Sequence, residues 1–267
     1  MYSRETGKRT IRALSVLLLT VTAACSSVPK PDPDAPPEER LRYAWALLER
    51  SSYYSAQQAF EDLIFSAPGS AIIDSAHYGL AECYFGMDNY IQAVSEYETV
   101  ISSFPRSGLV DDAAFQIGVA NWEQSLSYKL DQTETLKAIE AFRAFVQDYP
   151  ASDRVDEALG YLQQAEDKIA MKTIYLAESY LKLGTDSDYQ AALMYFSEAI
   201  RDFPSSSHLP RAIFGLGEAY FRKGEFENAR QALGALVADF PESEYTERAR
   251  KRMRDLPPPP ASQIPPS

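Results

Sequence analysis

The chain has 267 residues, of which 45% are hydrophobic and 12% aromatic, so it holds enough apolar side chains for a sizeable folded core. Its formal net charge is −12. This acidic balance argues against binding to the phosphate backbone of a nucleic acid, which requires clustered lysines and arginines. We therefore expect no nucleic acid partner.

The first 24 residues have the pattern of an export signal. Basic residues end at Arg12, and the apolar run over residues 13–24 is too short to cross a bilayer as a helix. The run closes in "VTAAC", which resembles the lipobox of bacterial lipoproteins, where the signal is cut before an acylated cysteine. The sequence thus predicts a lipoprotein signal peptide over residues 1–24 and lipidation of Cys25, which would anchor the chain to a membrane. The alternative is an ordinary secretory signal beside an incidental cysteine.

Prolines concentrate at the two ends of the remaining chain. Residues 25–38 alternate five prolines with small and charged residues, which predicts an extended tether behind the lipidated cysteine. Residues 257–267 hold six more prolines and are predicted to form a disordered tail. The second cysteine, Cys83, then has no disulfide partner within the chain, and we expect it to be a small buried hydrophobic residue.

One pattern recurs five times between the proline-rich ends: alanine, a bulky apolar residue four positions later, then proline, serine and a second alanine at fixed spacing. The copies occupy residues 56–76, 93–113, 138–158, 192–212 and 229–249. Alanine and the bulky residue share one face of a helix, and proline ends that helix. The serine is expected to be the N-cap of the next helix. The pattern therefore predicts an all-α solenoid of five tetratricopeptide (TPR)-like helix-turn-helix repeats over residues 39–256.

The repeat spacing is irregular at two points. The third copy has about eight extra residues around "SLSYKLDQTE", which predicts either a longer first helix or an extended turn. The fourth copy is preceded by an insertion of about four helical turns. We expect one long helix from about Asp153 to Leu183, because this stretch has no proline and a single glycine.

A solenoid of this kind binds peptides or domains on the concave face lined by its first helices. The repeat frame places aromatic residues there in the first three copies: Trp45, Tyr78, Phe85, Phe115 and Trp122. We interpret them as a candidate groove for extended peptides with aromatic side chains. The alternative for each ring is that it packs into the neighbouring repeat, as helically spaced aromatic residues commonly do.

No motif of the chain indicates an enzyme. The sequence has no His/Cys/Asp cluster, glycine-rich phosphate loop or nucleophile elbow, so we expect no catalytic residue, no metal site and no cofactor. The basic run "RARKRMR" at residues 248–254 is interpreted as a solvated capping helix with cations near its C-terminus. The alternative is a docking site for an acidic partner or for lipid head groups.

The lipobox, the tether, five TPR-like repeats and the long helix together resemble the BamD family, lipoproteins of the outer-membrane β-barrel assembly machinery. The stretches "DQTETLKAIEAFRAFVQDYPASDRVDEA" and "KIAMKTIYLAESYLK" are especially similar to that family's third repeat and following helix. The resemblance implies lipid anchoring at the periplasmic face of the outer membrane. It also implies that the N-terminal repeats bind C-terminal signals of unfolded outer-membrane proteins, and that the C-terminal repeats bind the POTRA domains of BamA beside other lipoproteins of the machinery.

One position departs from the family pattern. The family's fourth repeat often has an arginine after its paired alanines, whereas this chain has Tyr195. Arg201 and Arg222 are the candidates to replace that charged contact with BamA, and with Tyr195 they form the predicted partner-docking set.

Two other classes of protein are alternative interpretations of the sequence. A periplasmic TPR scaffold similar to the cell-division coordinator CpoB shares the repeats but begins with a coiled coil and lacks the acylated cysteine. A lipoprotein that scaffolds cell-wall hydrolases would share the anchor without the "DQT" stretch.

Overall fold

The computed structural model describes residues 28–258, and within them the secondary structure consists of eleven helices and no strand. They are α1 (Pro37–Leu48), α2 (Tyr53–Ser66), α3 (Ile73–Gly86), α4 (Tyr90–Ser103), α5 (Val110–Gln124), α6 (Thr133–Asp148), α7 (Val155–Leu183), α8 (Asp186–Asp202), α9 (Leu209–Lys223), α10 (Phe226–Asp239) and α11 (Glu244–Arg254). The predicted all-α class with TPR-like repeats is confirmed. The predicted lipidation site Cys25, the predicted signal peptide and most of the proline-rich tail lie outside the described residues.

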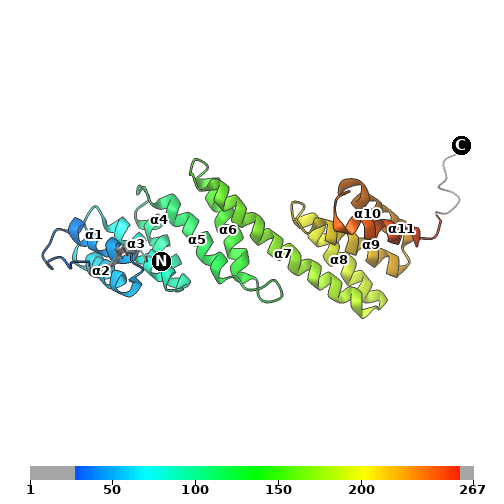
Figure 1. The fold of residues 1–267 in the computed structure, drawn as a ribbon, viewed down its shortest axis with the longest axis horizontal. Helices are drawn as coiled ribbons and strands as arrows, with labels where there is room; N and C mark the ends of the chain where they lie inside the picture. Colours follow the sequence, from blue (N-terminus) through cyan, green and yellow to red (C-terminus); the bar gives the residue numbers. More distant parts are fainter. Residues whose placement is uncertain (1–27, 259–267) are drawn as a thin grey trace, which may run out of the picture.

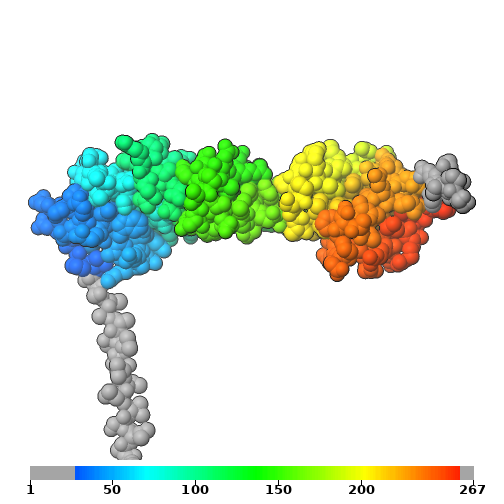
Figure 2. Space-filling model, turned by 90° about the horizontal axis from the view of Figure 1, so that it is seen from above, coloured from blue at the N-terminus to red at the C-terminus, as the bar shows by residue number. Residues whose placement is uncertain are grey.

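Each helix packs on the next in the chain, and the pairs follow one another along an elongated molecule (Figure 1). The first helices of successive pairs also contact each other, as α1 does with α3, α5 and α9 with α7, and α11 with α9. They therefore form the inner side of the solenoid, while α2, α4, α6, α8 and α10 lie outside. Figure 2 shows the same extended body as a space-filling surface, with the first repeats at one end and α11 near the other.

The recurring alanine and bulky residue form the core of every repeat. All five alanines and their partners Phe60, Tyr97, Phe142, Phe196 and Leu233 are fully buried. Glycines on the first helices allow several of these bulky side chains to pack closely against the helix backbone. A Cβ atom on Gly118 would lie 2.5 Å from the Phe142 ring, and one on Gly215 would lie 2.3 Å from the Phe196 ring. Glycine is required at these two positions because no larger residue allows so close an approach.

The turn between repeats differs from the prediction. Each second helix ends two residues before the repeat proline, as expected, but the serine is the N-cap only in the last copy, where Ser243 accepts a hydrogen bond from the backbone N–H of Tyr245. In the other copies the helix begins later, with N-caps such as Leu109 and Arg154. Ser107 instead accepts from the Leu109 N–H at 3.1 Å, within a turn. The N-cap prediction is therefore wrong for four copies, because these serines form a tight turn before the helix starts.

The long helix is confirmed as α7, which has 29 residues and a length of about 44 Å. Its N-terminal part packs on α5 and α6, and its C-terminal part packs on α8 and α9 (Figure 1). Gly160 lies on its surface with open space around it, and Gly184 ends it with a φ of 89°. This one helix therefore joins the two halves of the solenoid.

The extra residues of the third copy form an extended turn, 125–132, between α5 and α6. Gln132 organises it, because its buried side-chain amide donates to the carbonyl groups of Ser127, Leu130 and Asp131. Two lysines of α7 hold the turn in place, as Lys168 donates to the Ser125 hydroxyl at 2.6 Å and Lys172 donates to the Leu130 carbonyl. The "DQT" stretch thus has a structural role in this turn.

Cys83 is free and fully buried, as expected, and burial raises the pKa of its thiol to about 12.

Val28 packs against the core cluster of the first repeat, so the described part of the tether, residues 28–36, begins in contact with the domain. None of the described helices combines the length and the hydropathy that crossing a bilayer requires.

Asp167 of α7 holds the turn that precedes α9. Its carboxylate accepts from the backbone N–H of Ser207 at 3.0 Å and from the Ser207 hydroxyl at 2.8 Å. Burial opposes ionisation of Asp167, but the hydrogen bonds from Ser206 and Ser207 lower its pKa below the usual range. A lowered carboxylate pKa stabilises the fold above the unfolded-state pKa of about 3.9, and that stability is lost as the pH falls through the folded-state value.

We therefore expect Asp167→Asn to lower the free energy of unfolding by about 1 kcal/mol at neutral pH, since a hydrogen-bonded charge is lost at a partly exposed site. The difference from the parent chain should shrink as the pH falls below about 4. Urea unfolding at a series of pH values measures it, with Glu140→Gln on the exposed surface of α6 as control. A difference that is the same at every pH would contradict this role.

Candidate partner-binding surface

The inner face of the first two repeats carries an aromatic pair from α1 and α3. The Trp45 ring stacks on the Tyr78 ring at 6.4 Å between centroids, and its indole N–H donates to the Ser75 hydroxyl at 3.3 Å. Tyr78 in turn meets the Tyr97 ring edge-on at 5.5 Å. Trp45 and Tyr78 are half-buried, so each is held by the fold while part of its ring faces solvent. Rings held in this way offer contact area at a low entropic cost.

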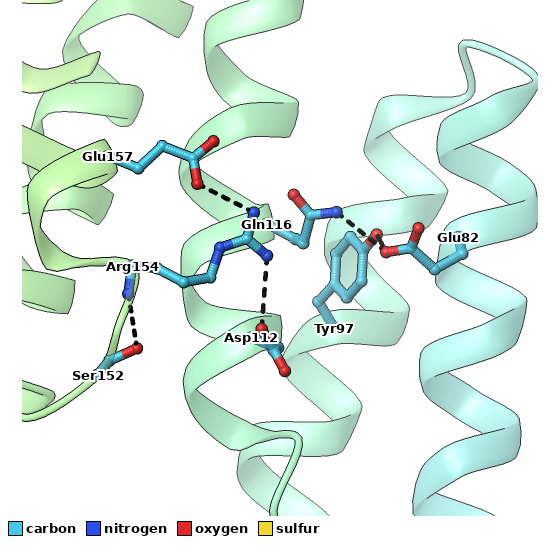
Figure 3. A network of polar contacts seen from close by, with 7 residues as sticks. All are labelled: Glu82, Tyr97, Asp112, Gln116, Ser152, Arg154 and Glu157. Carbon is cyan, nitrogen blue, oxygen red and sulfur yellow. Dashed lines mark hydrogen bonds and ion pairs between the residues drawn. The ribbon is translucent and has the colours of Figure 1, made fainter. Parts of the chain in front are cut away.

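A polar network continues from this pair along the inner face (Figure 3). Glu82 of α3 accepts from the Tyr97 hydroxyl at 2.6 Å and from the Gln116 amide of α5 at 3.0 Å. Burial and the neighbouring Glu82 carboxylate raise the pKa of both Tyr78 and Tyr97, so both phenols stay neutral. The network fixes α3, α4 and α5 to one another beside the aromatic pair.

Arg154, the N-cap of α7, extends the network to the third repeat (Figure 3). Its guanidinium donates to Asp112 at 3.4 Å and to Glu157 at 3.2 Å, and it lies 3.9 Å from the centroid of the Phe115 ring. Burial lowers the pKa of Arg154, but the hydrogen bonds to Glu157 and Asp112 outweigh burial and raise it. The inner face of the N-terminal half is therefore an aromatic pair followed by carboxylates that are held in place.

The other three predicted groove residues do not extend the pair. Phe115 is 1% exposed and packs on Phe142, Phe145 and Tyr161 in the core. The prediction that Phe115 lines the groove is therefore wrong, because α6 and α7 cover this ring. Phe85 is half-buried and meets the Tyr90 ring edge-on. Trp122 is half-buried beneath Lys168, whose Nζ lies 3.9 Å from the ring. Among the five predicted residues, a ring contact joins only Trp45 and Tyr78.

A hollow lies on the inner face of the C-terminal half, between α7, α8, α9 and α11. It has a volume of about 260 Å³ and we call it the C-terminal cup. Its walls are Glu178, Leu181, Lys182, Phe196, Arg211, Phe214, Gly215, Glu218, Arg222, Tyr245 and Arg248. The basic run at residues 248–254 lies in α11 and contributes Arg248 to these walls.

Two ion pairs hold the cup together across helices. Arg211 of α9 binds Glu178 of α7 through two hydrogen bonds of 2.8 Å. Arg252 of α11 binds Glu218 of α9 through Nε and Nη2, with the second contact at 2.9 Å. Each pairing raises the pKa of its arginine, chiefly through the hydrogen bonds to the carboxylate. Two-point contacts of this kind fix both charge and orientation.

The predicted partner-docking residues do not form one cluster. Tyr195 of α8 stacks on Tyr180 of α7 at 5.6 Å. Arg201 is bound by its neighbour Asp202 at the C-terminal end of α8, whereas Arg222, at the C-terminal end of α9, donates to the Leu181 carbonyl at 3.1 Å. Since α8 and α9 form an antiparallel hairpin, the two arginines are about 20 Å apart along it. The three residues are therefore spread over separate places: Arg222 lines the cup and Arg201 does not.

The described residues hold no group of three or more histidine, cysteine, aspartate or glutamate side chains that could bind a metal ion. Within residues 28–258 several charged side chains of the inner face instead form ion pairs between helices, as Arg154, Arg211 and Arg252 do.

Comparison with known proteins decides the family. The model of the YfiO family, described as outer membrane lipoprotein, matches residues 33–233, which is most of the solenoid. This chain belongs to the YfiO family. It is 26% identical over 254 residues to the outer membrane protein assembly factor BamD of Caulobacter vibrioides, a match that covers 93% of this chain and 82% of that protein. The BamD protein of Rickettsia prowazekii is 22% identical over 252 residues, with 92% of this chain and 96% of that protein covered.

Among solved structures, a thermophilic TPR protein of Thermus thermophilus has a TM-score of 0.35 and 14% identity to this YfiO-family chain, covering 82% of it and 98% of the other. The family-level resemblance inferred from the repeats is confirmed.

Proposed function

We propose that the protein is a docking subunit for outer-membrane β-barrel assembly, which binds unfolded barrel proteins on its N-terminal inner face. The observation that carries the proposal is the family match over residues 33–233, which spans the aromatic pair and most of the cup. Both curated relatives are named as outer membrane protein assembly factors. The half-buried Trp45–Tyr78 pair supplies a surface suited to the aromatic end of an extended peptide.

The C-terminal repeats are the proposed contact for the POTRA domains of BamA, beside the other lipoproteins of the machinery. In this proposal the chain is anchored through an acylated Cys25 at the periplasmic face of the outer membrane, and it contributes binding and no catalysis. Hydrogen bonds between helices already engage Glu82 and Glu178 of the inner face, which supports a role in binding and not in catalysis.

Depletion of the protein from its host tests the proposed function. We expect loss of folded barrel proteins from the outer membrane fraction and accumulation of unfolded ones in the periplasm. Re-expression of the parent chain should restore them. Unchanged barrel protein levels after full depletion would contradict the proposal.

Metabolic labelling with palmitate tests the anchor separately. The parent chain should incorporate label, and Cys25→Ala should not. Label in the Cys25→Ala chain would place the acyl group elsewhere.

A further inference from the structure

The C-terminal cup differs from the N-terminal inner face in the state of its charges. Beside the aromatic pair the balance of charge is acidic, since the polar network holds three carboxylates, Glu82, Asp112 and Glu157, and one arginine, Arg154. The walls of the cup carry four cations, Lys182, Arg211, Arg222 and Arg248, and two carboxylates. In a chain with a net charge of −12, such a basic hollow is a local exception.

Both carboxylates of the cup are already bound. Arg211 donates two hydrogen bonds to Glu178, and Arg252 donates two to Glu218. No ion pair occupies Arg222 or Arg248 within residues 28–258. The charge that remains in the cup is therefore positive.

The geometry of Arg248 leaves it ready to bind a carboxylate. Its guanidinium lies over the Phe214 ring at 4.5 Å and over the Tyr245 ring at 5.1 Å. Stacking uses the flat face of the guanidinium and leaves its N–H edge free to donate. Two aromatic rings also limit its rotation, so less entropy is lost when a ligand binds.

Arg222 is held on the same walls by a neutral partner. One of its N–H groups donates to the Leu181 carbonyl near the end of α7, and this contact does not cancel its charge. Its remaining N–H groups can donate to an incoming anion. Leu181 and Phe214, which are 9% and 8% exposed, add a small apolar surface to the walls of the cup, whereas Phe196 is fully buried behind it.

We propose that the C-terminal cup binds an acidic segment of a partner protein, with its carboxylates on Arg222 and Arg248 and an apolar side chain against Phe214. A volume of about 260 Å³ lies below the range of about 300–1,000 Å³ typical of pockets for small-molecule ligands, and it suits one or two side chains of a peptide. A flat bilayer surface fits a recessed, inward-facing hollow poorly. The inference does not require the proposed peptide site at the aromatic pair, but it rests on the proposed role of the C-terminal repeats as a partner contact, whose chemistry it names.

Fluorescence anisotropy with the purified full chain tests the proposal. The probe is a fluorescein-labelled peptide of sequence Glu-Asp-Phe-Asp-Glu, and the comparison peptide is Gln-Asn-Phe-Asn-Gln. We expect the acidic peptide to bind more tightly, and its affinity to fall as salt is added, because charge contacts carry the binding. Equal binding of both peptides, or a lack of binding by the acidic one, would overturn the proposal.

Charge reversal locates the site. Arg222→Glu and Arg248→Glu should each weaken binding of the acidic peptide about tenfold. The matched control is Arg254→Glu, an exposed arginine of the same helix α11 that does not line the cup, and it should leave binding unchanged. Circular dichroism checks that each variant is folded. Equal losses in all three would show that net charge, rather than the cup, attracts the peptide.

Two more arms separate this site from other surfaces. Trp45→Ala should bind the acidic peptide as the parent chain does, since Trp45 lies in the first repeat. Any binding of phosphatidylglycerol vesicles by the parent chain should be the same in Arg222→Glu and Arg248→Glu. If both substitutions abolish vesicle binding and the acidic peptide does not bind, the cup would be a site for lipid head groups and the proposal would be overturned.

Discussion

Phe142→Ala should lower the free energy of unfolding by about 3–5 kcal/mol, the largest stability change that we expect from a single substitution in this chain. The ring is fully buried on α6, stacks on Tyr161 of α7 at 5.2 Å and tilts against Phe115 of α5 at 5.8 Å. Its removal leaves a cavity that Gly118, with no side chain, cannot fill. Phe142 packs against the first turns of α7, so its removal weakens the packing of the helix that joins the two halves of the solenoid.

Urea unfolding followed by circular dichroism measures the Phe142→Ala effect. Because each repeat of a solenoid contacts only its neighbours, a weakened joint should also broaden the transition or split it into two. The control is Phe65→Ala, since Phe65 is 89% exposed on α2 and its loss should change stability by less than about 0.5 kcal/mol. Similar effects of the two substitutions would contradict the assigned core.

Trp45→Ala should weaken binding of a peptide from the C-terminal strand of an outer-membrane barrel protein by about 30-fold, or about 2 kcal/mol. The substitution removes the ring that stacks on Tyr78 and leaves the partner ring without support on one side. Anisotropy with a fluorescein-labelled peptide that ends in phenylalanine measures the change.

Two controls accompany Trp45→Ala. Tyr54→Ala removes an aromatic residue that is 67% exposed on α2, and it should not change peptide binding. Ser75→Ala removes only the hydrogen bond to the Trp45 indole and should weaken binding by a few-fold at most. Binding that survives Trp45→Ala in a folded chain would exclude the aromatic pair as the peptide site.

The repeat pattern was sufficient to predict the fold because its information is local. Ala56 and Phe60 are one helical turn apart, and the same spacing recurs in each repeat, so the helix pairs and their buried faces follow from the sequence. The length of α7 followed in the same way from an insertion without proline. Four of the five repeat serines were misassigned as N-caps because a tight turn and an N-cap use the same side chain.

The candidate sites depend on contacts between distant residues, and these were only partly predictable. Tyr78 and Phe115 occupy the same position of successive repeats, yet Phe115 is buried because Phe142, Phe145 and Tyr161 surround it. Nothing in the repeat frame distinguishes the two. The pairs that shape the cup, such as Glu218 with Arg252 of α11, join different helices and become visible only when the solenoid is assembled.

Site-specific photocrosslinking in the host envelope tests the central claim, that the inner face of the N-terminal repeats receives unfolded barrel proteins. A photoreactive amino acid is placed at Tyr78 on the inner face or at Tyr54 on α2, and the adducts are identified by mass spectrometry. We predict adducts with outer-membrane barrel proteins from position 78 and none from position 54. No barrel protein adducts at position 78, or equal yields at both positions, would contradict the account.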